Sequence, residues 1–150
     1  MEGITKGSKR FTHKTVVTWN EEKKSFLCSI GNQTIEIAAS PDSKRNEGMR
    51  TPEELFLDSI ESFIKDAFID FAKRNNLEIL SYESEGQGIV EKVEDKLMFT
   101  EIKIWPQIVV VTNGQIGKAR ELIELAGKDC FILNFIRCKV SIYPEIKIGL

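Results

Sequence analysis

The chain has 150 residues, of which 41% are hydrophobic and 29% are charged, and its formal net charge is -2. These values are typical of one folded globular domain and argue against a disordered chain. The near-neutral charge, with basic residues scattered along the chain, argues against nucleic-acid binding. No apolar run reaches the roughly 18 residues that a membrane span needs, and the N-terminus lacks a secretion signal. We therefore expect a cytoplasmic protein with no membrane partner.

The N-terminal third carries three short segments that predict an antiparallel meander. The expected strands cover residues 11–20, 25–31 and 33–39. Gly31 and Asn32 favour a tight turn between the second and third strands. Residues 1–10 are polar and basic, and we expect them to be flexible.

Residues 51–76 carry the clearest helix signal in the chain. Thr51 and Glu54 have the spacing of a capping box, and Pro52 suits the first helical position. Two adjacent apolar stripes run along this helix: Phe56, Ile60, Phe63, Ala67 and Phe71, and beside them Leu57, Ile64, Phe68 and Ala72. A surface helix shows one apolar band, so two stripes predict burial against a sheet and also against a second helix or a second subunit.

The C-terminal half predicts a long hairpin, a second helix and a last strand. The hairpin strands cover residues 77–90 and 96–112, and Pro106 predicts a bend, a bulge or an edge position in the second of them. The second helix is expected over residues 114–127, with its end at Gly127. The complete order is three strands, a long helix, two strands, a shorter helix and a strand, which is an α+β domain.

Three cysteines and one histidine limit the chemistry that the chain can perform. Cys28, Cys130 and Cys138 have no C-x-x-C spacing, so neither a disulfide framework nor a zinc site is indicated. With His13 as the single histidine, a histidine triad or a multi-histidine metal site is hard to assemble, and we expect no cofactor. Asp129 could cap a helical turn that places Cys130 at a helix N-terminus, where a thiolate is favoured.

Three segments, in this order, resemble the OsmC/Ohr family, which includes thiol-dependent organic hydroperoxide reductases: residues 51–65, 96–104 and 119–134. The family's Pro-Glu-x-Leu helix motif is matched by Pro52, Glu53 and Leu55, and its Phe-Thr-x-Ile strand is matched by Phe99, Thr100 and Ile102. Its second-cysteine segment is matched at Cys130 and Asn134. The resemblance runs from about Gly48 to the C-terminus. It implies the OsmC-like α+β fold, in the order βββ-α-ββ-α-β, assembled as an intertwined homodimer with active sites near the dimer interface.

The resemblance also implies a set of site residues. In family peroxidases a thiolate on the central helix attacks the peroxide, and the resulting sulfenic acid condenses with a second cysteine that a dithiol later releases. Glu53 matches the family's glutamate, Cys130 matches its second cysteine, and Arg45 and Arg50 are candidates for its arginine. The position of the first cysteine falls on Phe63, which has no nucleophile. The resemblance therefore predicts that the two-cysteine mechanism is lost.

Three functions remain open. The first, which we favour, is a dimer without peroxidase activity, whose shallow apolar cavity near Phe56, Ile60, Phe63 and Cys130 binds a small hydrophobic or thiol-bearing molecule. The second is one-cysteine peroxidase chemistry in a peroxide stress response, which requires Cys130 to be accessible and its pKa to be lowered. The third is a domain that acts only by recognising another protein.

Overall fold

The computed structural model describes residues 9–20, 25–30, 33–38 and 49–149, with residues 20 and 25–30 described as backbone only. The chain divides into two compact units, Met1–Pro52 and Glu53–Leu150. The expected flexibility of residues 1–10 falls almost entirely outside the described residues, and a single domain over the whole chain stays a prediction. No helix among the described residues is long and apolar enough to cross a bilayer.

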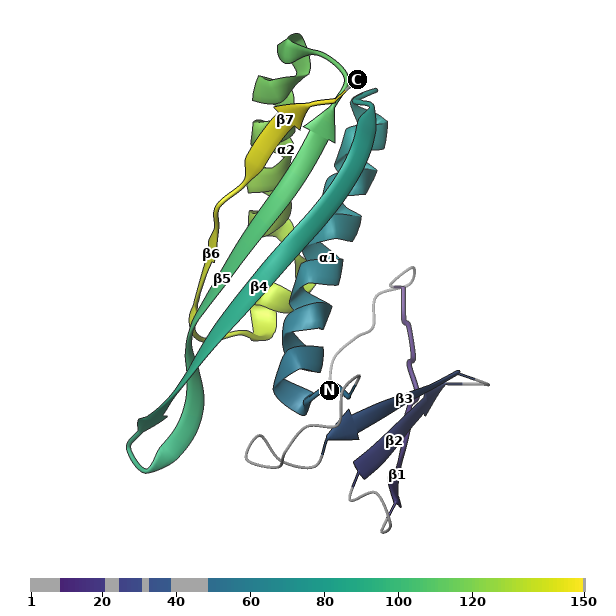
Figure 1. The fold of residues 1–150 in the computed structure, drawn as a ribbon, viewed down its shortest axis with the longest axis vertical. Coiled ribbons are helices and arrows are strands. Elements are labelled where there is room, and N and C mark those ends of the chain that lie inside the picture. Colours follow the sequence, from purple (N-terminus) through teal and green to yellow (C-terminus); the bar gives the residue numbers. More distant parts are fainter. Residues whose placement is uncertain (1–8, 21–24, 31–32, 39–48, 150) are drawn as a thin grey trace. The chain divides into compact units, whose positions relative to one another are not determined.

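The first unit contains an antiparallel sheet of three strands in the order β1-β2-β3 (Figure 1). The strands are β1 (Val16–Asn20), β2 (Ser25–Ile30) and β3 (Gln33–Ala38). This sheet confirms the predicted meander, although the first strand is shorter than expected. The predicted turn at Gly31 and Asn32 and the side chain of Cys28 lie outside the described residues. Arg50 returns to the edge of this sheet, where its carbonyl oxygen accepts a 2.7 Å hydrogen bond from the Ala38 amide.

The second unit consists of a four-stranded sheet with both helices on one of its faces (Figure 1). Its elements are α1 (Pro52–Arg74), β4 (Ile79–Val93), β5 (Lys96–Val110), α2 (Ile116–Asp129), β6 (Lys139–Ile142) and β7 (Glu145–Ile148), with 3-10 turns at Asn113–Gln115 and Phe131–Phe135. β5 is central, because it pairs antiparallel with β4 on one side and parallel with β6 and then β7 on the other. The α+β class is confirmed, and the single last strand that the sequence predicts is two short strands.

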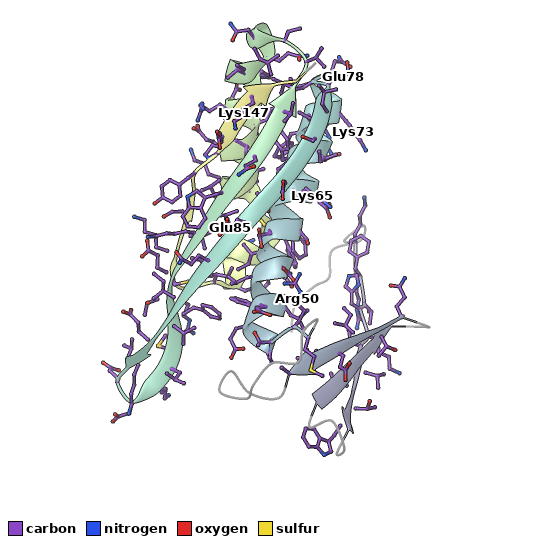
Figure 2. All side chains as sticks on the ribbon, in the orientation of Figure 1. Arg50, Lys65, Lys73, Glu78, Glu85 and Lys147 are labelled. Carbon is purple, nitrogen blue, oxygen red and sulfur yellow. The ribbon has the colours of Figure 1, made fainter. Side chains whose placement is uncertain are left out.

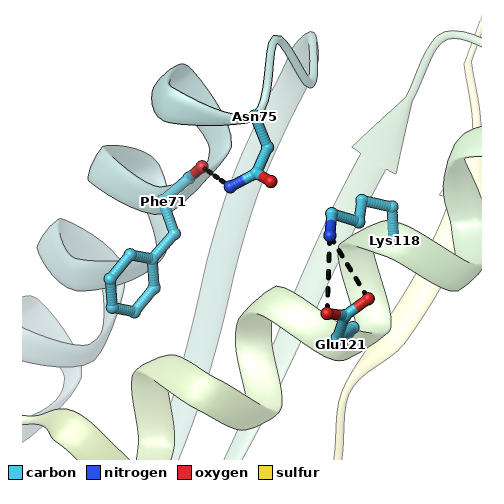
Figure 3. Close-up of polar contacts among 4 residues, drawn as sticks. All are labelled: Phe71, Asn75, Lys118 and Glu121. Carbon is cyan, nitrogen blue, oxygen red and sulfur yellow. Dashed lines mark hydrogen bonds and ion pairs between the residues drawn. The ribbon is translucent and has the colours of Figure 1, made fainter.

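The central helix begins and ends where its local signals predict. α1 starts at Pro52 and ends before Asn76, whose φ of 53° is the left-handed conformation that asparagine tolerates at a helix end. The Leu77 amide donates a hydrogen bond to the Ala72 carbonyl oxygen over 2.9 Å, which closes the last turn. The Asn75 side-chain amide donates to the carbonyl oxygen of Phe71 at 2.8 Å (Figure 3). Short-range hydrogen bonds therefore fix this end of the helix.

The core lies between the two helices and the inner face of the sheet. Fully buried side chains come from every fourth residue of α1, from the even-numbered residues of β5 and from one face of α2: Ile60, Ile64, Phe68, Ala72, Ile102, Ile104, Ile108, Val110, Ala119, Leu122, Ile123 and Ala126. The two-stripe prediction for α1 is only half met in the single chain, because Phe56, Ala67 and Phe71 are half-buried and Phe63 is 39% exposed.

Pro106 lies within β5 without a shift in the pairing with β4, so of the predicted bend, bulge or edge position the last is the one that fits. The carbonyl oxygens of Ile104 and Val110 accept hydrogen bonds from Tyr143 and Gly149, so even-numbered residues of β5 direct their backbone polar groups toward β6 and β7. Pro106 therefore faces the break between β6 and β7, where no strand requires the N–H group that proline lacks. The central strand tolerates a proline because its neighbour is interrupted at that point.

Gly127 lies inside α2 and does not end it, which corrects the predicted helix end. The helix continues to Asp129. A Cβ atom at position 127 would collide with the Cδ1 atom of Ile142, so the absence of a side chain lets the helix pack closely against β6. Gly127 allows close packing between α2 and β6. In the sequence, a glycine with this role cannot be distinguished from one that ends a helix.

Gly88→Ala is expected to lower the free energy of unfolding by about 1–3 kcal/mol. A Cβ atom at position 88 would lie 2.5 Å from Cε1 of Phe99 and 3.1 Å from Cδ2 of Leu57. The Phe99 ring cannot move away freely, because its centroid is 5.1 Å from that of Phe56. Urea denaturation of the wild type and the variant measures the difference.

Gly117→Ala is the matched control for that experiment. Position 117 lies in the first turn of α2, and a Cβ atom there meets nothing within 4 Å. Alanine should raise the free energy of unfolding by about 0.4–1 kcal/mol, since it restricts the unfolded chain at no steric cost. Equal effects of the two substitutions would contradict the packing that we describe around Gly88.

Candidate functional site

Cys130 joins α2 to the 3-10 turn Phe131–Phe135. Its side chain is only 2% exposed and belongs to the core between the helices and the sheet. The expected helical turn after Cys130 is present, although it is a 3-10 turn of five residues. Asp129 is the last residue of α2 and does not cap this turn, which corrects its predicted role. Cys130, which the resemblance gives as the second cysteine, therefore lies inside the core of the unit.

Burial raises the pKa of the Cys130 thiol, because a thiolate loses its hydration in the core. Backbone hydrogen bonds at Ile132 and Leu133 offset only part of this effect. Both properties are the reverse of what one-cysteine chemistry requires, since that hypothesis needs an accessible thiol with a lowered pKa. Among the described residues, Cys138 is the other free thiol; it is half-buried, and burial raises its pKa as well.

Alkylation should distinguish these two thiols in the native protein. Iodoacetamide at pH 7.5 is expected to modify Cys138 before Cys130, and Cys130 should react at least about 100-fold more slowly than in the denatured chain. Because its pKa is raised, the thiolate fraction of Cys130 should still be rising as the pH passes 9. Peptide-resolved mass spectrometry over a pH series measures both rates. Faster labelling of Cys130 at neutral pH would contradict its burial.

Phe63, at the position that the resemblance gives to the first cysteine, packs against the residue that follows Cys130. The ring centroids of Phe63 and Phe131 are 5.5 Å apart, and those of Phe131 and Phe135 are 5.4 Å apart in an edge-to-face arrangement. We call these three residues the aromatic ladder. They are 39%, 60% and 72% exposed respectively. The chain therefore presents three touching rings at its surface, next to the place where Cys130 is buried.

The other residues of the predicted apolar cavity are buried or half-buried in the chain. Ile60 is fully buried in the core, and Phe56 is half-buried against Phe99. Two cavities in the described part of the chain lie on the outer face of the sheet, and a smaller one of about 150 Å³ lies at the end of α1, lined by residues that include Ile69 and Leu77. None of these three cavities is lined by Phe56, Ile60, Phe63 or Cys130, and the cavity expected around those residues stays a prediction.

Glu53 is the predicted acidic residue that shares a unit with Cys130. It lies in the first turn of α1, half-buried, and its Oε2 atom is buried without a hydrogen-bond partner among the described residues. Arg50 is exposed in the first unit, and Arg45 lies outside the described residues. No group of three or more side chains that could hold a metal ion occurs in residues 9–149 as far as they are described.

The sequence prediction missed Phe135 as a member of the aromatic ladder. Phe131 and Phe135 are four residues apart on the short turn after Cys130, and this spacing was the signal that could have found the pair. Their approach to Phe63 joins α1 to a segment almost 70 residues later in the chain, and it depends on how α2 packs. No local pattern in the sequence contains that information.

No protein-family model and no curated protein matches the sequence. Solved structures, in contrast, match it over nearly its whole length. An OsmC-like protein of unknown function from Vibrio cholerae has a TM-score of 0.79 at 21% identity, over 91% of this chain and 100% of that one. An OsmC-like protein from Mycoplasma pneumoniae also has a TM-score of 0.79, at 14% identity, over 93% and 99%. The organic hydroperoxide resistance protein OhrB of Bacillus subtilis has a TM-score of 0.65 at 22% identity, over 91% and 98%. The chain therefore has the fold of the OsmC-like proteins.

Proposed function

We propose that this protein is an OsmC/Ohr-like homodimer that has lost two-cysteine hydroperoxide reduction and binds a small hydrophobic molecule beside the aromatic ladder. The observation that carries the proposal is the contact of Phe63 with Phe131, because the resemblance gives position 63 to the first cysteine. A phenyl ring can neither attack a peroxide nor form a disulfide. Cys130, the remaining candidate thiol, is buried and its pKa is raised.

Exposure of the aromatic ladder supports assembly with a second copy of the chain. Monomeric proteins seldom leave large contiguous apolar patches in water, and aromatic residues are enriched at protein interfaces. The stripe of α1 that contains Phe63 continues this apolar surface along the helix through half-buried Ala67 and Phe71. A second copy that covers the ladder would also bury this stripe, which is one of the two arrangements that the two-stripe pattern of the helix predicts.

A ligand at the covered ladder would be small and largely apolar. The rings of Phe63, Phe131 and Phe135 present faces and edges without polar groups, so they favour an aliphatic or aromatic partner over a charged one. A thiol-bearing molecule is also compatible, since sulfur packs favourably against aromatic rings. Glu53, with its buried and unpaired Oε2 atom, could accept a hydrogen bond from such a ligand.

The alternative is a one-cysteine thiol peroxidase that uses Cys130. This function would require the Cys130 thiol to become exposed, because the side chain is only 2% exposed and its burial raises the pKa of the thiol. These two observations make it the weaker candidate.

Consumption of cumene hydroperoxide with excess dithiothreitol tests the proposal directly. We expect the wild type to be no faster than the dithiol alone, and Cys130→Ser to be unchanged, because the chain holds no accessible thiolate at this site. A rate in the wild type that Cys130→Ser abolishes would establish the one-cysteine enzyme in place of the proposed function.

A further inference from the structure

The outer face of the second sheet, opposite the helices, carries a cavity of about 300 Å³. It is lined by Glu85, Trp105, Pro106, Gln107, Tyr143 and Glu145. Trp105 is opposite Glu85 on β4, and Gln107 is opposite Glu145 on β7. A neighbouring cavity of about 250 Å³ shares Gln107 and Glu145 and extends toward Glu83. The two cavities are therefore adjacent along one face of the sheet.

An aromatic pair forms one wall of the larger cavity. The rings of Trp105 and Tyr143 are stacked, with centroids 5.9 Å apart and an interplanar angle of 26°. Tyr143 is 48% exposed, and Trp105 is half-buried. Tyr143 is held in place through its backbone, because its amide donates a 2.8 Å hydrogen bond to the carbonyl oxygen of Ile104. The break between β6 and β7 that accommodates Pro106 thus also positions this ring beside Trp105.

The charges that line the larger cavity are all negative. Glu145 pairs with Lys147 at 3.1 Å, but that lysine does not line the cavity. Glu85, opposite Trp105, makes no hydrogen bond or ion pair within the part of the chain that the structure describes, and Glu83 two residues away lies on the same face. Figure 2 labels Glu85 and Lys147 on this face of the sheet. The cavity therefore combines two aromatic side chains with an uncompensated carboxylate.

These two features together select one class of ligand. An anion would be repelled by Glu85 and Glu145, and a neutral apolar molecule would have to remove water from both carboxylates without any compensating interaction. An organic cation is attracted by both components, because aromatic faces and carboxylates each stabilise positive charge. The volume is at the lower limit for small-molecule sites, which fits a single ammonium or guanidinium group with a few carbon atoms.

We infer that the cavity between Trp105, Tyr143 and Glu85 is a binding site for a small organic cation. The site lies on the sheet face away from the helices, whereas the aromatic ladder is formed by α1 and the turn after α2. It is therefore independent of the proposed dimer and of its hydrophobic ligand. The carboxylate of Glu85 balances the charge, and Trp105 and Tyr143 contact the alkyl groups around it.

Tryptophan fluorescence can test this inference in the full chain. The chain has two tryptophans, so Trp19→Phe leaves Trp105 as the only reporter. Choline is the probe, and 3,3-dimethylbutan-1-ol, which has the same shape without the charge, is its matched neutral control. We expect saturable quenching by choline in the millimolar range and at least about fivefold weaker binding of the neutral compound.

Two variants in the Trp19→Phe background assign the effect to the cavity. Glu85→Gln and Tyr143→Leu should each weaken choline binding about two- to fivefold. Glu78→Gln, which removes the same charge at an exposed position before β4, should leave it unchanged. Circular dichroism confirms that each variant is folded.

Three outcomes would overturn the inference: equal affinity for choline and its neutral control, equal effects of Glu85→Gln and Glu78→Gln, or no saturation below about 10 mM choline. Quenching by glucose without quenching by choline would overturn it in favour of a polyol site.

Discussion

Replacing Phe63 with cysteine is expected to give the protein an organic hydroperoxide reductase activity of at least about tenfold above that of the wild type. Position 63 is 39% exposed on α1 in the single chain. In the proposed dimer it borders the small-molecule site, so a thiol there would meet a peroxide or a small dithiol that enters this site. The new thiolate would attack the O–O bond, which releases the alcohol and leaves a sulfenic acid on the protein. Excess dithiothreitol then reduces the sulfenic acid to the thiol and releases water. Loss of cumene hydroperoxide, measured against enzyme concentration, gives the rate.

A second cysteine variant shows whether a thiol at position 63 reacts with the peroxide faster than an ordinary surface thiol does. Leu125, on α2, is 40% exposed, which matches Phe63 closely. Leu125→Cys should react with the peroxide only as fast as an ordinary surface thiol, and Phe63→Ser should be inactive because it has no thiol. Equal rates for Phe63→Cys and Leu125→Cys would mean that nothing around position 63 favours the reaction. The proposed descent from a peroxidase site would then lose its support.

Phe135→Glu is expected to convert a homodimer into a monomer at micromolar concentration. Phe135 is 72% exposed in the single chain, so a carboxylate there costs the fold little. In the proposed dimer the same carboxylate would be buried against apolar rings without a partner, which costs several kcal/mol. The dissociation constant should therefore rise at least about 100-fold. Light scattering after size-exclusion chromatography measures the mass of each species.

Leu125→Glu is the control for the dimer experiment. It places the same charge at an exposed leucine of α2, outside the aromatic ladder, and should remain a dimer. A wild-type protein that is monomeric at these concentrations would contradict the proposed assembly outright. Dissociation by both glutamate variants would instead move the interface away from the ladder.

Signals within a few residues of each other were sufficient to predict the elements. Pro52 marks the start of α1, and Asn75 and Asn76 mark its end, because capping hydrogen bonds connect atoms within one or two helical turns. The hairpin strands β4 and β5 lie in the two segments that are rich in β-forming residues. The predicted order of strands and helices was right apart from the last strand, which is interrupted at Tyr143 and Pro144. Pro106 of the neighbouring strand β5 faces this interruption.

The candidate site could be predicted only as a set of positions. The resemblance supplied Glu53, Phe63 and Cys130, but it could not say which of them reaches solvent. Gly127 shows the same limit, since its sequence context fits a helix end and its function is close packing on Ile142. The exposure of a residue and its close contacts depend on which faces of distant elements pack together. The residue type at a single position does not determine this packing.

The sequence by itself therefore determined the α+β class, the boundaries of α1 and the absence of a nucleophile at position 63. These properties depend on local hydrogen bonding and on the identity of single residues. Only the tertiary structure decided that Cys130 is buried with a raised pKa, that Phe63 meets Phe131, and that Trp105 and Tyr143 stack in a cavity that Glu85 also lines. Each of these depends on the packing of segments far apart in the chain, where the hydrophobic effect selects which surfaces are removed from water.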